Sequence, residues 1–227
     1  MALLLNIDTS TEKASVCLGN DGKTIGIAFN DEQKDHASWL HTAIKKIMDD
    51  SGTELKELEA IAVTAGPGSY TGLRVGMAAA KGLCYSLEKP LIIENTLKVI
   101  AYAATKVSAI SLDATDLLCP MIDARRMEVF TGTYTPELEE VYASRALILD
   151  ENSFKNELDA SKLYFFGSGS IKWKPLCAHI NAFFINVNFN AGDLFFLAEQ
   201  KFKIRAFADL AYVEPLYIKE FYTVSKK

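Results

Sequence analysis

Four glycines, a proline, a serine and a threonine are gathered in residues 65–76, which read Ala-Gly-Pro-Gly-Ser-Tyr-Thr-Gly-Leu-Arg-Val-Gly. Glycine permits positive φ and leaves backbone N–H groups uncovered, so such a turn at the start of a helix can hold a phosphate or a carboxylate. Arg74 would add a positive charge beside it. The residue chemistry leaves two interpretations open: an anion-binding turn, or a tight structural turn that lets a helix lie close to a sheet.

The glycine spacing fits neither of the two familiar phosphate loops. Gly66, Gly68 and Gly72 form G-x-G-x-x-x-G, one residue longer than the dinucleotide fingerprint, and the Gly-Lys-Ser/Thr end of a P-loop is missing. An anion or nucleotide site built here would be completed by polar residues at the end of the first predicted strand. Its candidate contacts are Asp8, Thr9, Gly66, Gly68, Ser69, Thr71, Gly72 and Arg74.

Other groups with possible chemistry are isolated. His36 and His41 are five residues apart on a predicted helix, so their side chains point about 140° apart and cannot share an ion. We therefore predict no metal site and expect these two histidines and His179 to be polar surface or cap residues. The charged segment 123–128 is either a hairpin turn with solvated or paired charges, or part of a functional site.

The elements that must position the glycine turn follow from the spacing of apolar residues. The first thirty residues alternate as short strands joined by the hairpin signal Asn20-Asp21-Gly22, and the helical pattern that follows is stopped by Gly52. A buried strand precedes the glycine turn, and a helix with Ser69 or Thr71 as its N-cap follows it. The expected ranges are strands 2–8, 15–18, 24–29 and 60–65, and helices 36–49 and 75–87.

A second structural unit is indicated because the strand pattern restarts after Ile110. We place the boundary near residue 100, giving a first lobe of residues 1–100 with the glycine turn. Residues 101–227 form a smaller second lobe whose last segment returns to the first. The expected elements of the second unit are strands 117–122, 129–134, 145–149, 163–166 and 184–189, and a helix 193–203 capped by Asp193.

Composition indicates an ordinary globular protein. Of the 227 residues, 49% are hydrophobic, and 24 Lys and Arg against 29 Asp and Glu give a net charge of −5. A protein that grips RNA phosphates by itself normally has a basic excess, so we expect a partner to provide most of any RNA contact. The four cysteines are scattered, which predicts reduced and mostly buried thiols. No run of 18 apolar residues occurs, so we expect a cytoplasmic protein without membrane contact.

The string Gly-Pro-Gly-Ser-Tyr-Thr-Gly-Leu-Arg-Val-Gly at residues 66–76 closely resembles the signature of the TsaB (YeaZ) family of bacterial tRNA threonylcarbamoyladenosine biosynthesis proteins. Residues 3–10, 123–130 and 215–219 resemble the same family. The resemblance implies a two-lobed α/β fold of the actin-like and sugar-kinase-like (ASKHA) type, with ribonuclease H-like lobes and a reduced second lobe. A β-meander followed by α-β-α, as predicted here, is typical of one half of such a fold.

The resemblance also implies a function and its partners. TsaB-like proteins are non-catalytic scaffolds that activate TsaD, the enzyme that transfers a threonylcarbamoyl group to the adenine adjoining the anticodon, with TsaE as an associated ATPase. They pair with TsaD through two helices and form homodimers through the same face. No tightly bound cofactor is implied, with ATP or ADP at a site shared with the partner left open. On this sequence the implied interface residues are Trp39, Ala43, Gly76, Ala79, Ala80 and Leu83.

Two other functions remain as alternatives. Asp8, Thr9 and the glycine turn would serve an independent small-molecule kinase or ATPase of the same fold. Residues 11–14, however, lack the glycine that a polyphosphate loop generally needs, and Glu12 would repel phosphates. Short polar side chains at such a place also form turns by bonding their own backbone. The third alternative is a peptidase-like hydrolase, for which the sequence has no G-x-S-x-G motif.

Overall fold

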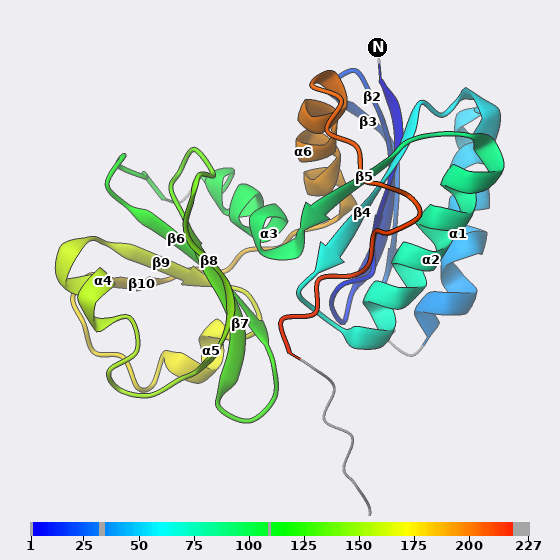
Figure 1. Ribbon diagram of the computed structural model, residues 1–227. Coiled ribbons are helices and arrows are strands. Elements are labelled where there is room, and N and C mark those ends of the chain that lie inside the picture. Colours follow the sequence, from blue (N-terminus) through cyan, green and yellow to red (C-terminus); the bar gives the residue numbers. More distant parts are fainter. Residues whose placement is uncertain (1, 32–34, 109, 220–227) are drawn as a thin grey trace, which may run out of the picture.

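Two five-stranded sheets in separate lobes form the core of the computed structural model, which describes residues 2–31, 35–108 and 110–219 (Figure 1). The first sheet has the strand order β3-β2-β1-β4-β5, and the second, starting from its β8 edge, has the order β8-β7-β6-β9-β10. In each sheet an antiparallel meander continues into two parallel strands. The two sheets therefore share one topology, which confirms the predicted two-lobed actin-like fold.

The first sheet contains the predicted meander and the strand before the glycine turn. Asp21 and Gly22 have φ values of 50° and 75° and form the expected two-residue turn between the second and third strands. The central strands are buried on both faces, as their continuous apolar sequence predicts. The strands are β1 (Leu3–Asp8), β2 (Ala14–Asn20), β3 (Lys23–Asn30), β4 (Ala60–Gly66) and β5 (Leu91–Asn95).

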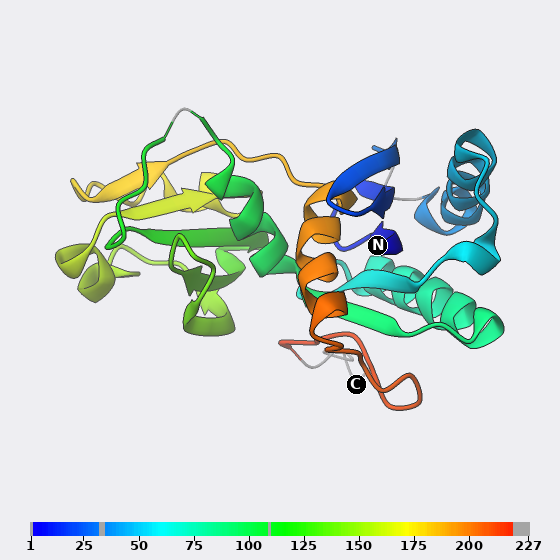
Figure 2. The same cartoon turned by 90° about the horizontal axis from the view of Figure 1, so that it is seen from above.

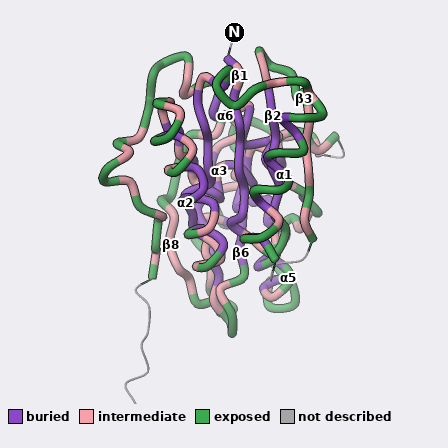
Figure 3. The backbone as a smooth tube through the Cα atoms, turned by 90° about the vertical axis from the view of Figure 1, so that its right-hand side faces the viewer, coloured by how far each residue is buried: buried purple, intermediate pink, exposed green. Residues whose placement is uncertain are grey.

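Helices cover both faces of this sheet. On one face lie α1 (His36–Ser51) and α2 (Tyr70–Leu87), whose inner sides are buried while their outer sides are exposed (Figure 3). The other face is covered by α6 (Ala191–Lys203). Helix α1 ends at Ser51, where Gly52, the predicted stop residue, forms a left-handed C-cap with a φ of 65°.

The second lobe is smaller because its connecting helices are short. Its sheet packs an aromatic core around the buried Trp173 and Phe165, whose ring centroids are 4.5 Å apart. None of the described helices of the molecule is long and apolar enough to cross a membrane. The second-lobe elements are β6 (Leu117–Asp123), β7 (Glu128–Tyr134), β8 (Glu140–Ile148), α4 (Lys155–Ala160), β9 (Leu163–Phe166), α5 (Ser170–Trp173) and β10 (Ala182–Phe184).

Two helices are exchanged between the lobes. Helix α3 (Thr96–Thr105) follows the last strand of the first sheet but packs its Leu97 against Leu118 and Tyr134 of the second. Helix α6 follows the second sheet but packs on the first. The two helices stand side by side between the sheets, where Lys106 pairs with Asp193 (Figure 2). The end of each lobe's chain therefore completes the core of the other lobe.

Four expected element boundaries are wrong. The expected strand 145–149 is β8, which begins five residues earlier, at Glu140. Helix α2 begins at Tyr70 rather than at residue 75, so two of the glycines lie inside it. The expected strand 184–189 is instead β10, which ends at Phe184. Helix α6 has Asn190 as its N-cap, and Asp193 is the third helical residue, whose carboxylate accepts a hydrogen bond from the Asn190 N–H at 2.9 Å. Together the two residues form a capping box.

Candidate functional site

The glycine turn (residues 66–69) joins β4 to α2 at the carboxyl end of the first sheet. Ser69 is the N-cap of α2: its Oγ accepts a hydrogen bond from the Gly72 N–H at 3.3 Å, and its carbonyl accepts one from the Leu73 N–H at 2.8 Å. Thr71, the other N-cap candidate, and Arg74 lie on exposed positions of the first turns of the helix. The turn thus places the start of α2 beside the carboxyl end of β4.

The space beside the glycine turn is filled by the chain's own first turn. The Ser69 N–H donates to the Ser10 carbonyl at 2.7 Å, and the Thr9 hydroxyl donates to the Gly72 carbonyl at 2.7 Å. A methyl group on Gly68 would overlap the Ser10 carbonyl, and one on Gly72 would overlap the Thr9 carbonyl. The two glycines are therefore required where two backbone segments touch. This geometry favours the structural-turn interpretation over anion binding.

Asp8 is buried next to this contact. Its Oδ1 accepts hydrogen bonds from the Ser10 N–H at 3.2 Å, the Ser10 hydroxyl at 2.6 Å and the Thr64 hydroxyl at 2.7 Å. Burial raises the pKa of Asp8, and these hydrogen bonds oppose the increase. The residue is 2% exposed, so its carboxylate fastens the turn between β1 and β2 rather than facing solvent.

A C-terminal segment, the strap (residues 208–219), crosses the other side of the glycine turn. The Leu216 N–H donates to the Ala65 carbonyl at 2.6 Å. A methyl group on Gly66, whose φ is 120°, would lie 2.7 Å from the Leu216 carbonyl oxygen. Gly66 is therefore glycine both for its positive-φ backbone and for the close approach of the strap.

A cavity of about 550 Å³ lies between the strap and the ends of β4 and β5. Its polar lining includes Glu94 and Lys201, whose Oε2 and Nζ atoms are 3.0 Å apart, and Glu214 of the strap. The remaining lining is largely apolar. The cavity is large enough for a small organic molecule, and its two carboxylates against one ammonium disfavour a polyphosphate.

The histidines do not form a metal site in the described part of the chain, where no group of three or more His, Cys, Asp or Glu is close enough to hold an ion. His36 is buried as the first residue of α1, rather than at the expected surface or cap position, with Nδ1 3.2 Å from the Asn30 amide and Nε2 3.3 Å from the Thr11 carbonyl. His41 is exposed, and His179 lies 3.4 Å from the carboxylate of Asp159. Cys17, Cys84, Cys119 and Cys177 are all free thiols, and the first three are buried, as predicted.

The charged segment 123–128 forms the turn between β6 and β7. The Asp123 carboxylate lies 2.7 Å from Lys172, and Glu128 lies 2.7 Å from Lys219 of the strap. Partial burial opposes ionisation of Asp123, but the hydrogen bonds from Lys172 and the Arg125 N–H outweigh it and lower its pKa. The hairpin interpretation is confirmed. Its charges are partly paired, and one of them reaches the first lobe's C-terminal segment.

The residues implied for a partner interface lie on α1 and α2, but most of them face inward. A methyl group on Gly76 would overlap the Thr9 hydroxyl, so this glycine lets α2 approach β1. Trp39 and Leu83 are partly buried at the edge of the same core. The inward-facing set, covered by the lobe itself, is Ala43, Gly76, Ala79 and Ala80.

Comparison with known proteins gives relatives among TsaB proteins and among tRNA N6-adenosine threonylcarbamoyltransferases. The family model described as TsaD, tRNA N6-adenosine threonylcarbamoyltransferase, matches residues 21–213. The tRNA threonylcarbamoyladenosine biosynthesis protein TsaB of Escherichia coli (strain K12) is 38% identical over 131 residues, covering 58% of this chain and 54% of that protein. TsaB of Bacillus subtilis (strain 168) is 31% identical over 149 residues, covering 64% and 62%. The chain thus spans between half and two thirds of the length of these relatives.

A solved structure of an uncharacterized Pseudomonas aeruginosa protein with similarity to peptidase YEAZ has a TM-score of 0.84 at 25% identity, covering 96% of this chain and all of that one. YeaZ from the same organism gives a TM-score of 0.81. Two lobes of shared topology with exchanged helices define the class as actin-like, two-lobed proteins. The chain belongs to the family of that model, and within it to the TsaB (YeaZ) group.

Proposed function

We propose that this chain is a non-catalytic subunit of the machinery that transfers a threonylcarbamoyl group to the adenine adjoining the anticodon of tRNA. It acts with a TsaD-type transferase and a TsaE-type ATPase. The observation that carries the proposal is the filled glycine turn: the Thr9 and Ser10 carbonyls occupy the space beside Gly68 and Gly72 that a bound anion would need. The similarity to TsaB proteins indicates the process, which is tRNA threonylcarbamoyladenosine biosynthesis.

The proposed partner surface is the outer side of α2 rather than its inner side. Four residues at intervals of three or four positions form a line along this helix. Gly82 has nothing within 4 Å of an added methyl group, and Tyr85 is 82% exposed. Small residues followed by an exposed aromatic ring suit a closely packed partner helix with one anchoring side chain. The line consists of Val75, Ala78, Gly82 and Tyr85, with Trp39 and Leu83 flanking it.

Gly82→Arg tests this surface without disturbing the fold. Replacing a helical glycine by arginine is expected to stabilise the monomer by up to about 1 kcal/mol, since glycine is the weaker helix former. A long charged side chain in a close helix contact is expected to weaken binding to the cognate TsaD-type protein by more than about tenfold. The matched control is Ala114→Arg, an exposed position in the second lobe. Equal affinity of Gly82→Arg and the control, measured by calorimetry, would remove α2 from the interface.

The same face accounts for a homodimer of the isolated chain. A surface suited to one helix partner can accept the equivalent helix of a second copy about a two-fold axis. Gly82→Arg is therefore expected to be monomeric in sedimentation at concentrations where the unmodified chain dimerises. Contact with tRNA is assigned mainly to the assembled complex, because the chain carries a net charge of −5.

The activity itself is tested by reconstitution. Threonylcarbamoyl transfer to tRNA is measured with this chain, the TsaD-type and TsaE-type proteins together, and with each one left out. Omitting this chain is expected to abolish transfer even though it supplies no catalytic side chain, because it shifts its partner toward the active conformation. Undiminished transfer in its absence would overturn the proposal.

One rival function, an independent small-molecule kinase or ATPase, would use Asp8, Thr9 and the glycine turn, although the carboxylates of the cavity beneath the strap disfavour a polyphosphate. Calorimetry of the isolated chain with ATP separates the two: micromolar binding with turnover supports the rival. Under the scaffold proposal the isolated chain binds ATP or ADP only weakly. Any nucleotide in the assembly is held at a site shared with the partner, and no cofactor is tightly bound by this chain alone.

A further inference from the structure

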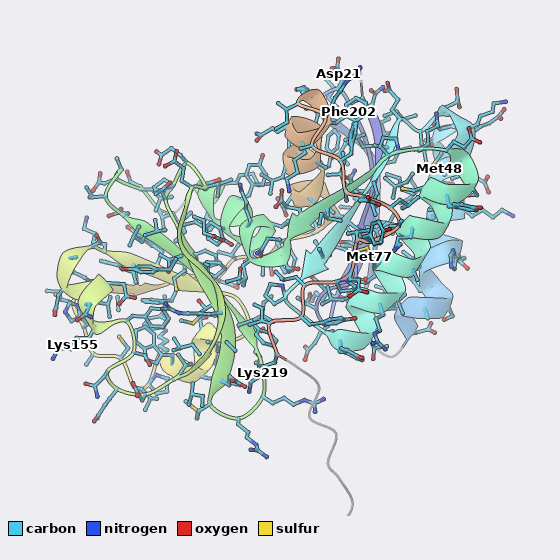
Figure 4. The ribbon with its side chains drawn as sticks, viewed as in Figure 1. Asp21, Met48, Met77, Lys155, Phe202 and Lys219 are labelled. Carbon is cyan, nitrogen blue, oxygen red and sulfur yellow. The ribbon has the colours of Figure 1, made fainter. Side chains whose placement is uncertain are left out.

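The strap follows a fixed path along the β5 edge of the first sheet (Figure 1). It leaves α6, pairs with Leu91 at the start of β5, passes the end of β4 and the glycine turn, and reaches Lys219, which Figure 4 labels between the two lobes. Three hydrogen bonds to its backbone groups help to hold it: Ala208 N–H to the Leu91 carbonyl (2.8 Å), Lys81 Nζ to the Val213 carbonyl (3.0 Å) and Leu216 N–H to the Ala65 carbonyl (2.6 Å).

Near its end the strap is fastened to α2 by three side chains, which we call the latch: Tyr70, Arg74 and Tyr217. The ring centroids of Tyr70 and Tyr217 are 5.1 Å apart. The Arg74 guanidinium lies 4.0 Å above the Tyr70 ring, and its Nε donates a hydrogen bond to the Tyr217 hydroxyl at 3.0 Å. Arg74, a long exposed side chain, is thereby held in one position.

The strap also lines the cavity at the ends of β4 and β5. Leu216 and Tyr217 form part of the wall of the cavity described above, opposite Glu94 and Lys201. Two residues further on, Lys219 Nζ lies 2.7 Å from the Glu128 carboxylate of β7 in the second lobe. Tyr217 is therefore shared by the cavity wall and the contact that holds Arg74, and the contact with the second lobe lies two residues further along the strap.

We propose that the strap is a releasable segment, fastened by the latch, that couples the outer face of α2 to the cavity beneath the strap. With Tyr217 seated, Arg74 is ordered and the cavity is closed on the strap side. With Tyr217 released, Arg74 is free and the cavity is open. The role assigned to α2 here rests on the proposed function, whereas the latch itself is a property of the isolated chain.

The position of Arg74 decides which state of the strap a partner on α2 prefers. Arg74 lies one helical turn before Ala78 on the exposed side of α2, so a partner on that side meets its guanidinium. Ordering a free arginine carries an entropic cost, and the latch orders it before the partner arrives. The partner therefore prefers the seated strap. By linkage, partner binding must shift the equilibrium toward the seated strap by the same factor by which seating raises the affinity for the partner.

Hydrogen exchange at the Leu216 amide reports directly on whether the strap is seated, because this N–H donates a hydrogen bond from the strap to the Ala65 carbonyl. Tyr217→Ala removes the stacking and the hydrogen bond and is expected to accelerate exchange at Leu216 by about tenfold. Tyr217→Phe keeps the ring and is expected to accelerate it about threefold. The matched control is Tyr212→Ala, on the same strap but 83% exposed, which is expected to leave exchange at Leu216 unchanged.

The second measurement uses the cognate TsaD-type partner. Tyr217→Ala is expected to weaken its binding several-fold, Tyr212→Ala is not, and partner binding is expected to slow exchange at Leu216 in the unmodified chain. Equal exchange at Leu216 in Tyr217→Ala and Tyr212→Ala would overturn the latch. Faster exchange with unchanged partner affinity would overturn the coupling to α2 and leave the proposed function intact. If the unmodified chain does not bind the partner, the proposed function fails, and with it the coupling to α2.

Discussion

The glycine turn and the turn after β1 approach so closely that one added carbon atom would cause a clash. Gly68 and Gly72 are positions where one added carbon would collide with a backbone carbonyl, whereas Gly82, in the same helix as Gly72, borders open space. Backbone cannot rotate away as a flexible side chain can, so the cost of an added methyl group differs sharply between these positions.

Gly72→Ala is therefore expected to lower the free energy of unfolding by about 2–3 kcal/mol. Gly82→Ala is expected to raise it by about 1 kcal/mol, since alanine is the better helix former. Chemical denaturation of both variants against the unmodified chain measures the two effects. A Gly72→Ala variant of unchanged stability would show that the glycine serves something other than this backbone contact.

Asp8 is expected to make the free energy of unfolding decrease as the pH rises. Because burial raises its folded-state pKa above the usual value of 3.8, ionising Asp8 is harder in the folded chain than in the unfolded one. Its contribution to stability is fully present below pH 3.8 and declines as the pH rises toward the folded-state pKa. Each pH unit of that interval removes about 1.4 kcal/mol.

Asp8→Asn keeps an oxygen that can accept the hydrogen bonds from Ser10 and Thr64 and removes the charge. The stability of the unmodified chain, measured relative to this variant, is expected to decline from pH 4 to pH 7. Other carboxylates titrate in both proteins, so the difference between the two denaturation series isolates Asp8. A difference that grows in favour of the unmodified chain over this range would contradict the assignment.

At the scale of elements, the sequence pattern was sufficient where local signals agree. The meander, its Asp21-Gly22 turn and the helix stopped by Gly52 all follow from turn chemistry and apolar spacing. The start of α2 was placed five residues late because Gly72 and Gly76 are poor helix formers, and their packing against Thr9 overrides that preference. Helix α3 was missed because its sequence is apolar on most sides, which is typical of a helix buried between two sheets.

The candidate site was only partly predictable for the same reason. The sequence brought Asp8, Thr9 and the glycine turn together, and the structure places them in contact. The sequence could not reveal that the space beside the glycine turn is filled, because the groups that fill it are the backbone carbonyls of Thr9 and Ser10. Tyr217 was singled out only within the segment 215–219, and nothing local to that segment indicates its partner 143 residues earlier.

The capping box of α6 provides a prediction at this scale. Asn190 Oδ1 accepts a hydrogen bond from the Gly192 N–H at 2.8 Å, so Asn190→Ala is expected to destabilise the chain by about 1 kcal/mol. Asn188→Ala, at an exposed position of the same segment, is the matched control and is expected to change stability by less than about 0.5 kcal/mol. Thermal unfolding compares them. Equal effects would mean that the cap bond contributes nothing measurable.

At the scale of the whole molecule, the exchange of α3 and α6 makes the lobes interdependent. Helix α6 covers the face of the first sheet that carries Leu4, Cys17 and Ile92, and Phe195 lies against Gly19 with no room for a side chain. Without α6 this face would be an open apolar surface, and the first sheet would lack one of its two covering layers.

A chain ending at residue 189 is therefore expected to lose cooperative unfolding and to bind a hydrophobic dye. Adding a peptide of residues 190–219 is expected to restore the cooperative transition, because the peptide carries α6 and the strap together. Calorimetry with and without the peptide checks this. A shortened chain that unfolds cooperatively at the original temperature would show that the first lobe is complete without α6.

The late position of α6 also sets an order of events during translation. The three strands of the meander leave the ribosome first, yet the helix that shields one of their faces is made only after residue 190. Until α6 is made, the nascent polypeptide exposes an apolar surface of the kind that chaperones at the ribosomal exit port recognise.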